Sequence, residues 1–555
     1  MYDVAIIGGG VCGCLLAYQL SRYNLRVALL EKDNDVGVGT TKANSAIAHA
    51  GYDPEPGTLM AKYNLAGSRM MPGLCQRLDV PYKNIGSLVV GFSEEERAAV
   101  EELYSRGLEN GVTGLEIWER EELHQREPAL ASEALFALYA PTAGIVSPWE
   151  LALAQAEVAA KNGVEFYLER EVTDISPQAA GGFAVETKFA GHPDSAALSA
   201  AAEQQTLNPG LFKNNSELNQ GKFIQNGAVE ETSQSNSAGL GGHMPTQKPC
   251  STPAELTLKA RFVVNAAGVA AADINAMAGG EAFAIHPSRG EYFLLDTTQG
   301  SLAKHVIFQC PNKDGKGVLV SPTVHGNLIV GPNAEPAKAD DFATTAEGLA
   351  FVRKMAVKSV PGIGFSDSIR NFAGLRAVAD TGDFIVGPSK AVPGFFNIAG
   401  IKSPGLTAAP AIGADMVNML AAAGLPLEEK QNFEDGRQVL RFDHLTHEQR
   451  AVATRQNPLY GHVVCRCRTV TEGEIQDALH RPIPPRSLDG VKRRCSPGMG
   501  RCQGGFCGPK VQAMMAQHYG VAQSQIPQSH PGTTIIFGET KDSEEVAAHD
   551  ADINH

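Results

Sequence analysis

The N-terminal stretch DVAIIGGGVCGCLLAYQLSRYNLRVALLE, residues 3–31, decides the fold of this chain. It starts with a buried-strand run at 4–7, continues through glycines into an apolar-periodic segment at 15–20, and ends with a second strand-like run at 26–30. Gly8, Gly10 and Gly13 match the pattern G-x-G-x-x-G. In that pattern the first glycine turns the chain, the second lets backbone approach a pyrophosphate, and the third lets the helix pack on the sheet. The stretch predicts a βαβ unit.

The same unit predicts a dinucleotide site. The N-terminus of the predicted helix faces the phosphates, and Glu31, at the end of the second strand, accepts hydrogen bonds from a ribose diol. The alternative is a βαβ unit with an incidental glycine turn. The motif alone leaves NAD and FAD both open.

Length and composition bound the function class. A chain of 555 residues is too long for one ordinary core, so two or three domains are expected. A hydrophobic share of 43%, a charged share of 19% and a formal net charge of −14 describe a globular protein and argue against nucleic-acid binding.

The location of the protein follows from segments we do not find. The first strand begins almost at residue 1, which leaves no room for a signal peptide, and no uninterrupted apolar run has spanning length. We therefore expect a cytoplasmic protein and leave peripheral contact with the inner face of the membrane open. Five of the ten cysteines lie between Cys465 and Cys507, which favours a metal site over disulfides.

A polar, glycine-containing loop follows Glu31. Residues 37–45 are glycines and small hydroxyl or amide residues that suit a cofactor's phosphates and ring edge. His49 follows this loop among small residues. Its pattern alone favours a hydrogen-bonded structural histidine over a general base.

The middle of the chain changes character twice. Residues 191–253 are rich in Ser, Asn, Gln, Gly and Ala without sustained periodicity, which predicts a surface insertion or disordered excursion. A buried strand then ends in Asn265-Ala266-Ala267-Gly268, where backbone passes close to a ligand or simply turns into a helix. From 289 to 332, short strands separated by Gly, Pro and Asn predict an antiparallel substrate-domain sheet.

The last part of the nucleotide domain is a strand, a turn and a helix. Residues 395–400 read as a strand, 401–407 as a glycine-proline turn and 408–420 as a helix whose N-terminus favours an anion or an electron-rich ring. Residues 426–459 read as a polar connector.

Together these pieces resemble the flavoprotein oxidoreductase superfamily that includes D-amino-acid oxidase, glycine oxidase and FAD-dependent glycerol-3-phosphate dehydrogenase. The resemblance spans about residues 2–425 and implies FAD rather than NAD. It is carried by the glycine motif with Glu31, the loop at 39–45, the segment at 265–268 and the turn at 399–405. The cofactor-binding residues that it implies are Gly8, Gly10, Gly13, Glu31, Thr40, Thr41, Asn44, Ser45, Ala267, Gly268, Gly400, Gly405, Leu406 and Thr407.

Two branches of the superfamily bear on the substrate. The segment around His49 resembles one found in both glycerol-3-phosphate dehydrogenases and L-2-hydroxyglutarate oxidases. Gly374-Leu375-Arg376 resembles the segment whose arginine meets the substrate phosphate in the glycerol-phosphate enzymes. Lys402 lies where those enzymes carry Gly-Gly-Lys, whereas residues 403–407 look more like the hydroxyglutarate branch. The resemblance implies His49 as base, with Arg376 and Lys402 on the substrate anion, unless Lys402 is an exposed turn residue.

The C-terminal cysteines form two close pairs, Cys465 with Cys467 and Cys502 with Cys507. Four thiolates satisfy a 2Fe–2S cluster, whereas a structural zinc normally uses C-x₂₋₄-C loops that C-x-C fits poorly. The segment resembles the bacterioferritin-associated ferredoxin-like domain, which follows such a flavoprotein in the large catalytic subunit of anaerobic glycerol-3-phosphate dehydrogenases. Cys495 is left out of the predicted ligand set.

The predicted fold class is α/β: a Rossmann-like FAD domain with an inserted antiparallel β substrate domain, plus a small helical iron–sulfur domain. The predicted domains are 1–425 (substrate segments about 45–150 and 283–390), a linker at 426–460, the iron–sulfur domain at 461–520 and a tail at 521–555.

The resemblance implies that sn-glycerol 3-phosphate is oxidised to dihydroxyacetone phosphate. FAD takes the hydride, and the cluster passes electrons to a quinone or to a redox or membrane-anchoring partner subunit. One alternative is a dehydrogenase of L-2-hydroxyglutarate or another 2-hydroxy or 2-amino acid. The other is an electron-transfer protein without substrate chemistry of its own.

Overall fold

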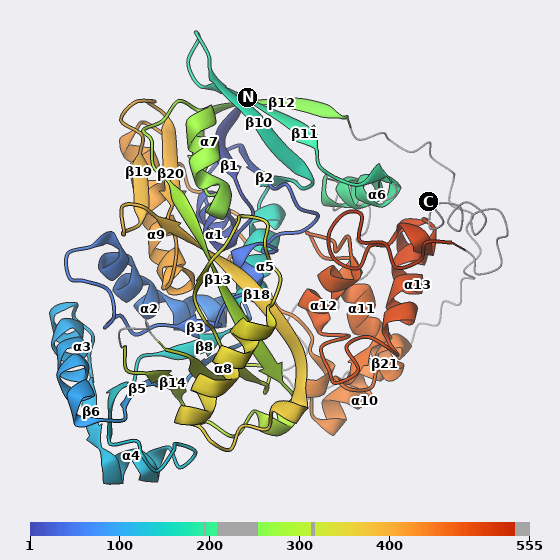
Figure 1. The fold of residues 1–555 in the computed structure, drawn as a ribbon. Coiled ribbons are helices and arrows are strands. Elements are labelled where there is room, and N and C mark those ends of the chain that lie inside the picture. The colour runs from blue at the N-terminus through green and yellow to red at the C-terminus, as the bar shows by residue number, and fades with distance from the viewer. Residues whose placement is uncertain (194–195, 208–252, 312–316, 539–555) are drawn as a thin grey trace, which may run out of the picture.

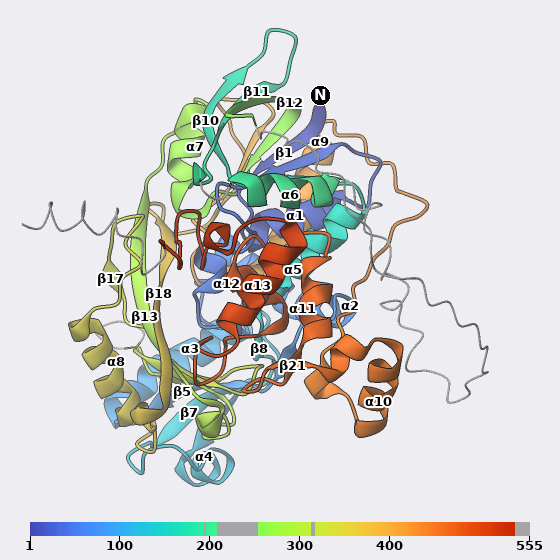
Figure 2. The ribbon, with the colours of Figure 1, turned by 90° about the vertical axis from the view of Figure 1, so that its right-hand side faces the viewer.

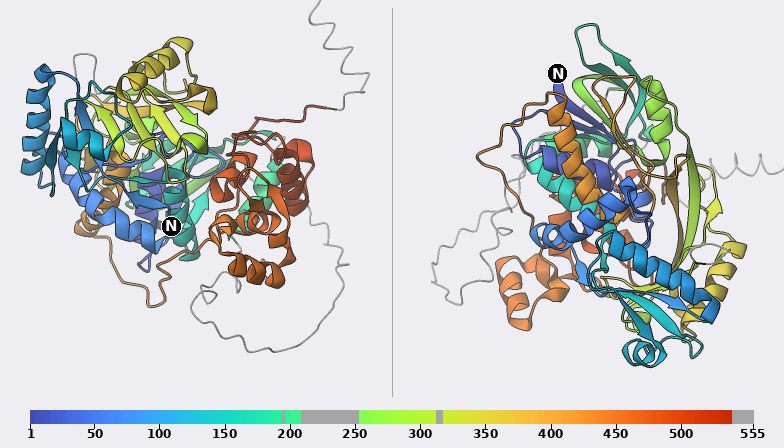
Figure 3. Two further views of the ribbon diagram at one scale, coloured as in Figure 1. Left: turned by 90° about the horizontal axis from the view of Figure 1, so that it is seen from below. Right: turned by 90° about the vertical axis from the view of Figure 1, so that its left-hand side faces the viewer.

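A computed structural model describes residues 1–193, 196–207, 253–311 and 317–538 of the chain. The described residues form an eight-stranded sheet, a nine-stranded sheet, two small sheets and a group of helices at the C-terminal end (Figure 1). Seen from below in Figure 3, the C-terminal helices lie to one side of the larger sheets.

The N-terminal stretch forms the centre of the eight-stranded sheet. Strand β1 (Tyr2–Ile7) pairs in parallel with β2 (Val27–Leu30) on one side and with β12 (Glu255–Asn265) on the other. The other strands of this sheet are β9 (Glu165–Tyr167), β10 (Arg170–Pro177), β11 (Phe183–Phe189), β19 (Ile385–Pro388) and β20 (Phe395–Ala399). The predicted βαβ unit is confirmed, because α1 (Val11–Leu20) connects β1 and β2.

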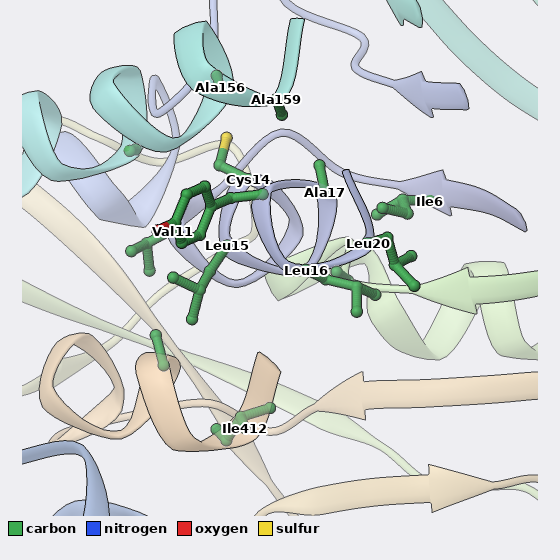
Figure 4. Close-up of a cluster of buried hydrophobic side chains, with 14 of the residues drawn as sticks. Ile6, Val11, Cys14, Leu15, Leu16, Ala17, Leu20, Ala156, Ala159 and Ile412 are labelled. Atoms are coloured by element: carbon green, nitrogen blue, oxygen red, sulfur yellow. The ribbon is translucent and has the colours of Figure 1, made fainter. Parts of the chain in front are cut away.

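Helix α1 is buried between two other helices. It packs against α5 (Pro148–Lys161) and α9 (Gly405–Ala422), and α9 also packs against α2 (Leu59–Arg77). Figure 4 shows Leu15 and Leu16 between Ala156 of α5 and Ile412 of α9. Both leucines are fully buried, which gives up to about 1.5–3 kcal/mol per side chain relative to exposure. The short helix α7 (Ala271–Met277) follows β12.

The nine-stranded sheet is built from the two segments that the sequence analysis assigns to a substrate domain. Its strands are β5 (Ser87–Gly91), β6 (Glu116–Glu119), β7 (Phe136–Ala140), β13 (Ile285–Leu295), β14 (Val306–Gln309), β15 (Leu319–Pro322), β16 (Leu328–Gly331), β17 (Glu335–Pro336) and β18 (Ser368–Ala379). The predicted antiparallel pairing is correct for most neighbours, but β14 and β5 are parallel. These two strands come from separate segments of the chain that meet in one sheet. The residue pattern of a strand does not indicate whether it pairs in parallel or antiparallel with a distant partner.

Smaller elements complete this region. A three-stranded sheet consists of β3 (Ile47–Ala48), β4 (Tyr82–Asn84) and β8 (Gly144–Val146). The helices here are α3 (Arg97–Glu109), α4 (Arg120–Arg126) and α8 (Ala346–Ser359).

The region predicted as an irregular insertion, 191–253, begins differently from that prediction. Residues Ala196–Leu207 form helix α6, and Leu198 and Ala202 are completely buried against the C-terminal helices. The segment is rich in alanine, the best helix former, and its apolar side chains pack against the C-terminal helices. The composition of the segment does not reveal this contact. Residues 208–252 lie outside the described residues.

The C-terminal region is a small helical body with its own core. It contains β21 (Val463–Cys465), β22 (Val470–Thr471), α11 (Glu472–Leu479), α12 (Leu488–Cys495) and α13 (Gly508–Tyr519). Helices α11, α12 and α13 pack on one another, and α12 contacts α5 (Figure 2). The predicted linker is not all irregular: it includes α10 (His447–Gln456), which starts at a capping box made by Thr446 and Gln449.

Candidate functional site

The glycine turn between β1 and α1 has the geometry of a phosphate cradle. Gly8 has φ +108°, and a Cβ there would lie 2.4 Å from the carbonyl oxygen of Ala266. A Cβ on Gly13 would lie 1.9 Å from the carbonyl oxygen of Gly8. Both positions therefore need glycine, for the turn and for close packing of α1 on the sheet. Gly10 is the N-cap of α1, so the N–H groups of the first helical turn open beside it.

Glu31 lies directly beside this turn. Its Oε2 accepts a hydrogen bond from the Gly9 N–H at 2.6 Å, and its Oε1 accepts one from the Asp33 N–H at 2.9 Å. Burial raises the pKa of Glu31, and nearby Asp33 adds to this, while the two N–H donors oppose it. Each carboxylate oxygen keeps a further lone pair, which suits the ribose hydroxyls of a dinucleotide.

The loop with the predicted residues Thr40, Thr41, Asn44 and Ser45 is tied to the cradle. The Val11 N–H donates to Thr41 Oγ1 at 3.0 Å, which fixes the loop at the first turn of α1. Asn44 folds the loop on itself by donating to the Thr41 carbonyl at 2.8 Å and accepting from the N–H of Ala46. These side chains thus hold the loop in shape.

The same loop contacts the substrate sheet. Thr40 Oγ1 donates to the Leu375 carbonyl at 2.7 Å, and a Cβ on Gly374 would lie 1.9 Å from the carbonyl oxygen of Ala43. Strand β18, which carries Arg376, therefore runs directly against the loop. Ser45 Oγ lies 3.3 Å from the hydroxyl of Tyr292 on β13.

Open space beside three backbone segments tests the fit of FAD. A Cβ on Gly39 or on Gly268 would meet no atom within 4 Å, and one on Gly10 would meet only Thr41 Oγ1, at 3.6 Å. Gly268 has φ +59° and follows Ala267, whose N–H donates to Asn265 Oδ1. The cradle, the loop and the end of β12 therefore all present bare backbone, which suits a bound dinucleotide.

The closing turn leads into α9. Gly400 has φ +66°, and its carbonyl accepts a hydrogen bond from the Lys402 N–H at 2.9 Å. The 18-residue helix α9 begins at Gly405 and has Leu406 and Thr407 in its first turn. Thr407 Oγ1 accepts from the His49 N–H at 2.8 Å. His49 is therefore fixed beside the N-terminus of α9, where the helix dipole favours negative charge.

The three residues predicted to act on substrate lie on different elements. His49 is half-buried, and its ring stacks on Phe308 of β14 with centroids 5.9 Å apart. Arg376 is half-buried and donates to Ser288 Oγ at 3.4 Å and to the Asn333 carbonyl at 3.2 Å, and Lys402 is half-buried in the closing turn. These contacts place His49 at the start of α9. Arg376 lies on β18, which contacts the loop at residues 37–45, called the cofactor loop below.

Tyr292 is a candidate residue that the sequence analysis missed. Its ring stacks on Phe372 of β18, with centroids 4.8 Å apart and planes at 9°, and its hydroxyl faces Ser45 of the cofactor loop. The β13–β18 register places Tyr292 opposite Phe372. That register depends on tertiary pairing, and no local motif marks the tyrosine.

The C-terminal thiols meet as two pairs, each joining the two cysteine segments. Cys467 Sγ and Cys502 Sγ lie 3.7 Å apart, and the thiols of Cys465 and Cys507 share a hydrogen bond. Two sulfurs on one tetrahedral metal, each about 2.3 Å from it, lie about 3.8 Å apart. Among the described residues no group of three or more Cys, His, Asp or Glu is arranged to hold one ion. Two pairs suit the two irons of a 2Fe–2S cluster better than a single zinc.

Backbone groups complete this site. The hydrogen bond from Cys507 lowers the pKa of Cys465 to about 5, with help from the N–H groups of Gly498, Arg468 and Cys467 and against the effect of burial. A lower pKa favours the thiolate, the form in which cysteine binds iron. A Cβ on Gly500 would lie 2.3 Å from the Cβ of Cys467, so the loop needs glycine there. Cys495 lies at the end of α12, outside both pairs, and its thiol donates to the Val491 carbonyl.

Buried ion pairs join the iron–sulfur body to the nucleotide domain. Asp35, four residues beyond Glu31, accepts hydrogen bonds from Arg493 at 2.7 Å and from Arg494 at 2.8 Å. Arg486 donates to Glu169 at 2.7 Å, and both side chains are at most 3% exposed. The cysteine-bearing body is therefore docked directly behind the cofactor loop, which no motif in the sequence indicates.

Comparison with known proteins matches both halves of this arrangement. Residues 3–419 match the family of FAD dependent oxidoreductases, and residues 463–517 match the BFD-like 2Fe-2S binding domain. The chain belongs to the FAD-dependent oxidoreductase family, and its cofactors are FAD and a 2Fe–2S cluster, as the sequence analysis predicted. It is an enzyme of that class, acting on a small-molecule substrate.

Particular relatives narrow the class. A glycerol 3-phosphate dehydrogenase from Caloramator mitchellensis is 42% identical over 544 residues, covering 98% of this chain and 99% of the relative. An L-2-hydroxyglutarate dehydrogenase from Escherichia coli is 29% identical and covers 60% of this chain and 64% of the relative. The structure of an L-alpha-glycerophosphate oxidase from Mycoplasma pneumoniae with FAD bound superposes with a TM-score of 0.63, at 30% identity over 79% of this chain and 98% of that one. The predicted resemblance to the glycerol-3-phosphate dehydrogenase branch is confirmed.

No helix in the described part of the chain is long and apolar enough to cross a membrane.

Proposed function

We propose that this protein oxidises sn-glycerol 3-phosphate to dihydroxyacetone phosphate and delivers the electrons through its C-terminal cluster to a partner protein or a quinone. The observation that carries the proposal is the 42% identity to a glycerol 3-phosphate dehydrogenase over both cofactor domains. FAD, when bound, supplies the two-electron acceptor, and the 2Fe–2S cluster supplies one-electron steps.

His49 is proposed to take the hydroxyl proton as the C–H bond of the alcohol carbon breaks. Its backbone is anchored to Thr407 and its ring is held against Phe308, so the imidazole has a fixed position near the start of α9. A positioned base of this kind contributes about 10²–10⁴ in rate. These contacts support the role because a general base must be held within reach of one proton.

Arg376 and Lys402 are proposed to bind the substrate phosphate. Ser288 and Asn333 each accept one hydrogen bond from Arg376. The remaining N–H groups of the guanidinium have no hydrogen-bond partner among the described residues and suit two oxygens of an anion. Lys402 adds a compact second cation, which favours a dianionic phosphate over a single carboxylate.

L-2-hydroxyglutarate, or another 2-hydroxy or 2-amino acid, is the second candidate substrate class. Arg376 favours it as well, because a guanidinium pairs with carboxylates as readily as with phosphates. A protein that only transfers electrons is less well supported, because the nine-stranded sheet with Arg376 contacts the cofactor loop.

The electron acceptor is proposed to be a separate redox or membrane-anchoring subunit. The support is the cluster domain itself, since a flavoenzyme that passes its electrons directly to a small oxidant does not need a one-electron centre.

Steady-state assays of the purified holoenzyme with a small artificial acceptor test the substrate. The proposal predicts turnover with sn-glycerol 3-phosphate. Turnover with L-2-hydroxyglutarate and none with sn-glycerol 3-phosphate would overturn it.

Two variants test the residue roles in the same assay. His49→Asn should lower kcat/KM by about 10²–10⁴ with FAD retained.

Arg376→Lys should raise KM about 10-fold or more with little change in kcat, because a forked contact becomes a point charge. Arg370→Lys, an exposed arginine on the same strand, is the matched control and should leave KM unchanged. An unchanged KM for Arg376→Lys would remove Arg376 from the phosphate site.

A further inference from the structure

The loop that carries Cys502 and Cys507 also presents an exposed aromatic ring. Phe506, immediately before Cys507, is 84% exposed, whereas Cys507 itself is buried. Among the large apolar residues that the structure describes, only Phe537, at 85%, is as exposed. Single exposed apolar residues are common, so exposure alone means little. The position of Phe506, next to a predicted iron ligand, is the unusual feature.

Two cations accompany Phe506. Arg466 lies between Cys465 and Cys467 and is exposed, and Lys510 is exposed in the first turn of α13. Neither forms an ion pair with a carboxylate within the described ranges. Arg501, on the same loop, differs from them because Asp296 and Asp367 neutralise it.

Arg466 and Phe506 belong to two segments that meet at one site, and Lys510 lies in the first turn of α13, directly after Cys507. Arg466 is next in sequence to Cys467, whose sulfur lies 3.7 Å from that of Cys502, and Phe506 is next to Cys507, whose thiol bonds to Cys465. The thiol contacts therefore bring both segments to the same small region. Cys467 is also exposed, so the site meets solvent on this side. We call Arg466, Phe506 and Lys510 the cluster-side surface.

The charge of this surface is opposite to that of the chain as a whole. The formal net charge of the protein is −14, yet the two charged residues of the cluster-side surface are both positive, and no carboxylate among the described residues pairs with either of them. A positive patch around an apolar centre is complementary to a protein with a carboxylate-rich surface. Steering by such charges raises the association rate, and electron-transfer contacts are characteristically small.

We propose that the cluster-side surface docks an acidic protein that carries one electron at a time. The proposal rests on the proposed function, in which oxidation of each alcohol delivers two electrons and releases protons. Each docked carrier accepts one electron from the reduced cluster, so two carriers are reduced per substrate and the cluster returns to its oxidised form. The phenyl ring of Phe506 forms the apolar centre of the contact, and Arg466 and Lys510 pair with carboxylates of the carrier.

Binding of a flavodoxin, an acidic one-electron carrier protein, to the intact holoenzyme tests the proposal without any substrate. We expect a Kd in the micromolar range at low ionic strength that rises at least 10-fold on raising the salt to about 0.2 M, because exposed charges are screened. The double variant Arg466→Glu/Lys510→Glu should weaken binding at least 10-fold, and Phe506→Ala several-fold. Iron content and the visible absorbance of the cluster verify that each variant holds its cofactors.

Matched variants lie in and near α8, which Figure 1 shows apart from α13. Phe342→Ala and Lys354→Glu remove an exposed aromatic ring and reverse an exposed charge near and in α8, and both should leave Kd unchanged. Cytochrome c, a basic carrier, provides a second control, because its affinity should not fall in the Arg466→Glu/Lys510→Glu variant. No measurable flavodoxin binding, or equal Kd values for the wild type and that variant, would overturn the proposal. Since no substrate is added, this result is independent of whether sn-glycerol 3-phosphate is oxidised.

Discussion

The glycine cradle and the cysteine loop, as we call segments 465–467 and 502–507 together, are predicted to hold their cofactors by different means. At the cradle the protein offers backbone: an added Cβ on Gly8 or Gly13 would lie within 2.4 Å of a carbonyl oxygen. At the cysteine loop it offers four side chains, one of them, Cys467, exposed to solvent. FAD binding should therefore depend on a backbone shape that only glycine allows at these positions. Cluster binding should instead depend on the chemistry of a few sulfur atoms.

The largest expected effect comes from changing the cradle. Gly13→Ala should abolish retention of FAD, because the new Cβ forces α1 away from the β1 turn, at a cost of about 3 kcal/mol. FAD content per protein, measured by absorbance after release, checks this. Gly73→Ala in α2 is the control, since a Cβ there meets nothing within 4 Å and should even stabilise the helix by about 0.5–1 kcal/mol. Full FAD occupancy in Gly13→Ala would refute the account of the cradle.

The next effect separates the two cofactors. Cys467→Ser should lose the cluster and retain FAD, because the hydroxyl is a poor substitute for the thiolate ligand opposite Cys502. Iron content, electron paramagnetic resonance of the reduced protein and flavin absorbance measure this. Cys495→Ser should keep the cluster. Loss of the cluster in Cys495→Ser, with its retention in Cys467→Ser, would reverse the predicted ligand set.

A third prediction concerns the junction between the two regions. Asp35→Asn should lower the free energy of unfolding by about 3–5 kcal/mol, because Arg493 and Arg494 stay buried without their carboxylate. Denaturant titration followed by cluster absorbance and flavin fluorescence measures it. Glu171→Gln, which breaks an exposed pair with Lys188, is the control and should cost less than about 1 kcal/mol. Equal losses in the two variants would contradict the role of Asp35.

The pH dependence of that junction has a definite sign. Burial opposes ionisation of Asp35, but Arg494 and Arg493 outweigh it and lower its pKa from 3.8 to about 2. A carboxyl whose pKa is lower when folded stabilises the fold above its unfolded pKa and loses that contribution as pH falls. The stability difference between wild type and Asp35→Asn should therefore shrink from about pH 4 to pH 2. A constant difference across that range would rule out this linkage.

The smallest expected effect lies within the iron–sulfur body. Thr471 caps α11 by accepting a hydrogen bond from the Glu474 N–H, and Glu474 in turn accepts from the Thr471 N–H. Thr471→Ala should lower the free energy of unfolding by about 1 kcal/mol, because the helix loses its N-cap. Iron content should stay unchanged, because Thr471 is not one of the four predicted iron ligands. Loss of iron in this variant would show that the cysteine loop depends on shape as strictly as the cradle.

Local constraints explain which features the sequence predicted. The βαβ unit and the four-thiolate site follow from glycine and cysteine spacings that act over a few residues. The strand predicted at 395–400, observed at 395–399, follows from its local run of residues, and the choice of FAD follows from the resemblance to a flavoprotein family. The proposed roles of His49, Arg376 and Lys402 stay predictions, although the contacts of their segments are compatible with them.

Long-range pairing explains what the sequence did not predict. Asp35 and Arg494 are 459 positions apart, and nothing near either residue specifies the other. The alanine-rich helix α6 depends on a partner surface in the C-terminal body, and the place of Tyr292 depends on the β13–β18 register. Tertiary partners of this kind override composition and leave no local pattern.

An anaerobic titration of the holoenzyme with sn-glycerol 3-phosphate, following flavin and cluster absorbance together, tests the central claim most directly. The account predicts that this substrate reduces both centres in the wild type and only the flavin in Cys467→Ser. Reduction by L-2-hydroxyglutarate with no response to sn-glycerol 3-phosphate would contradict it.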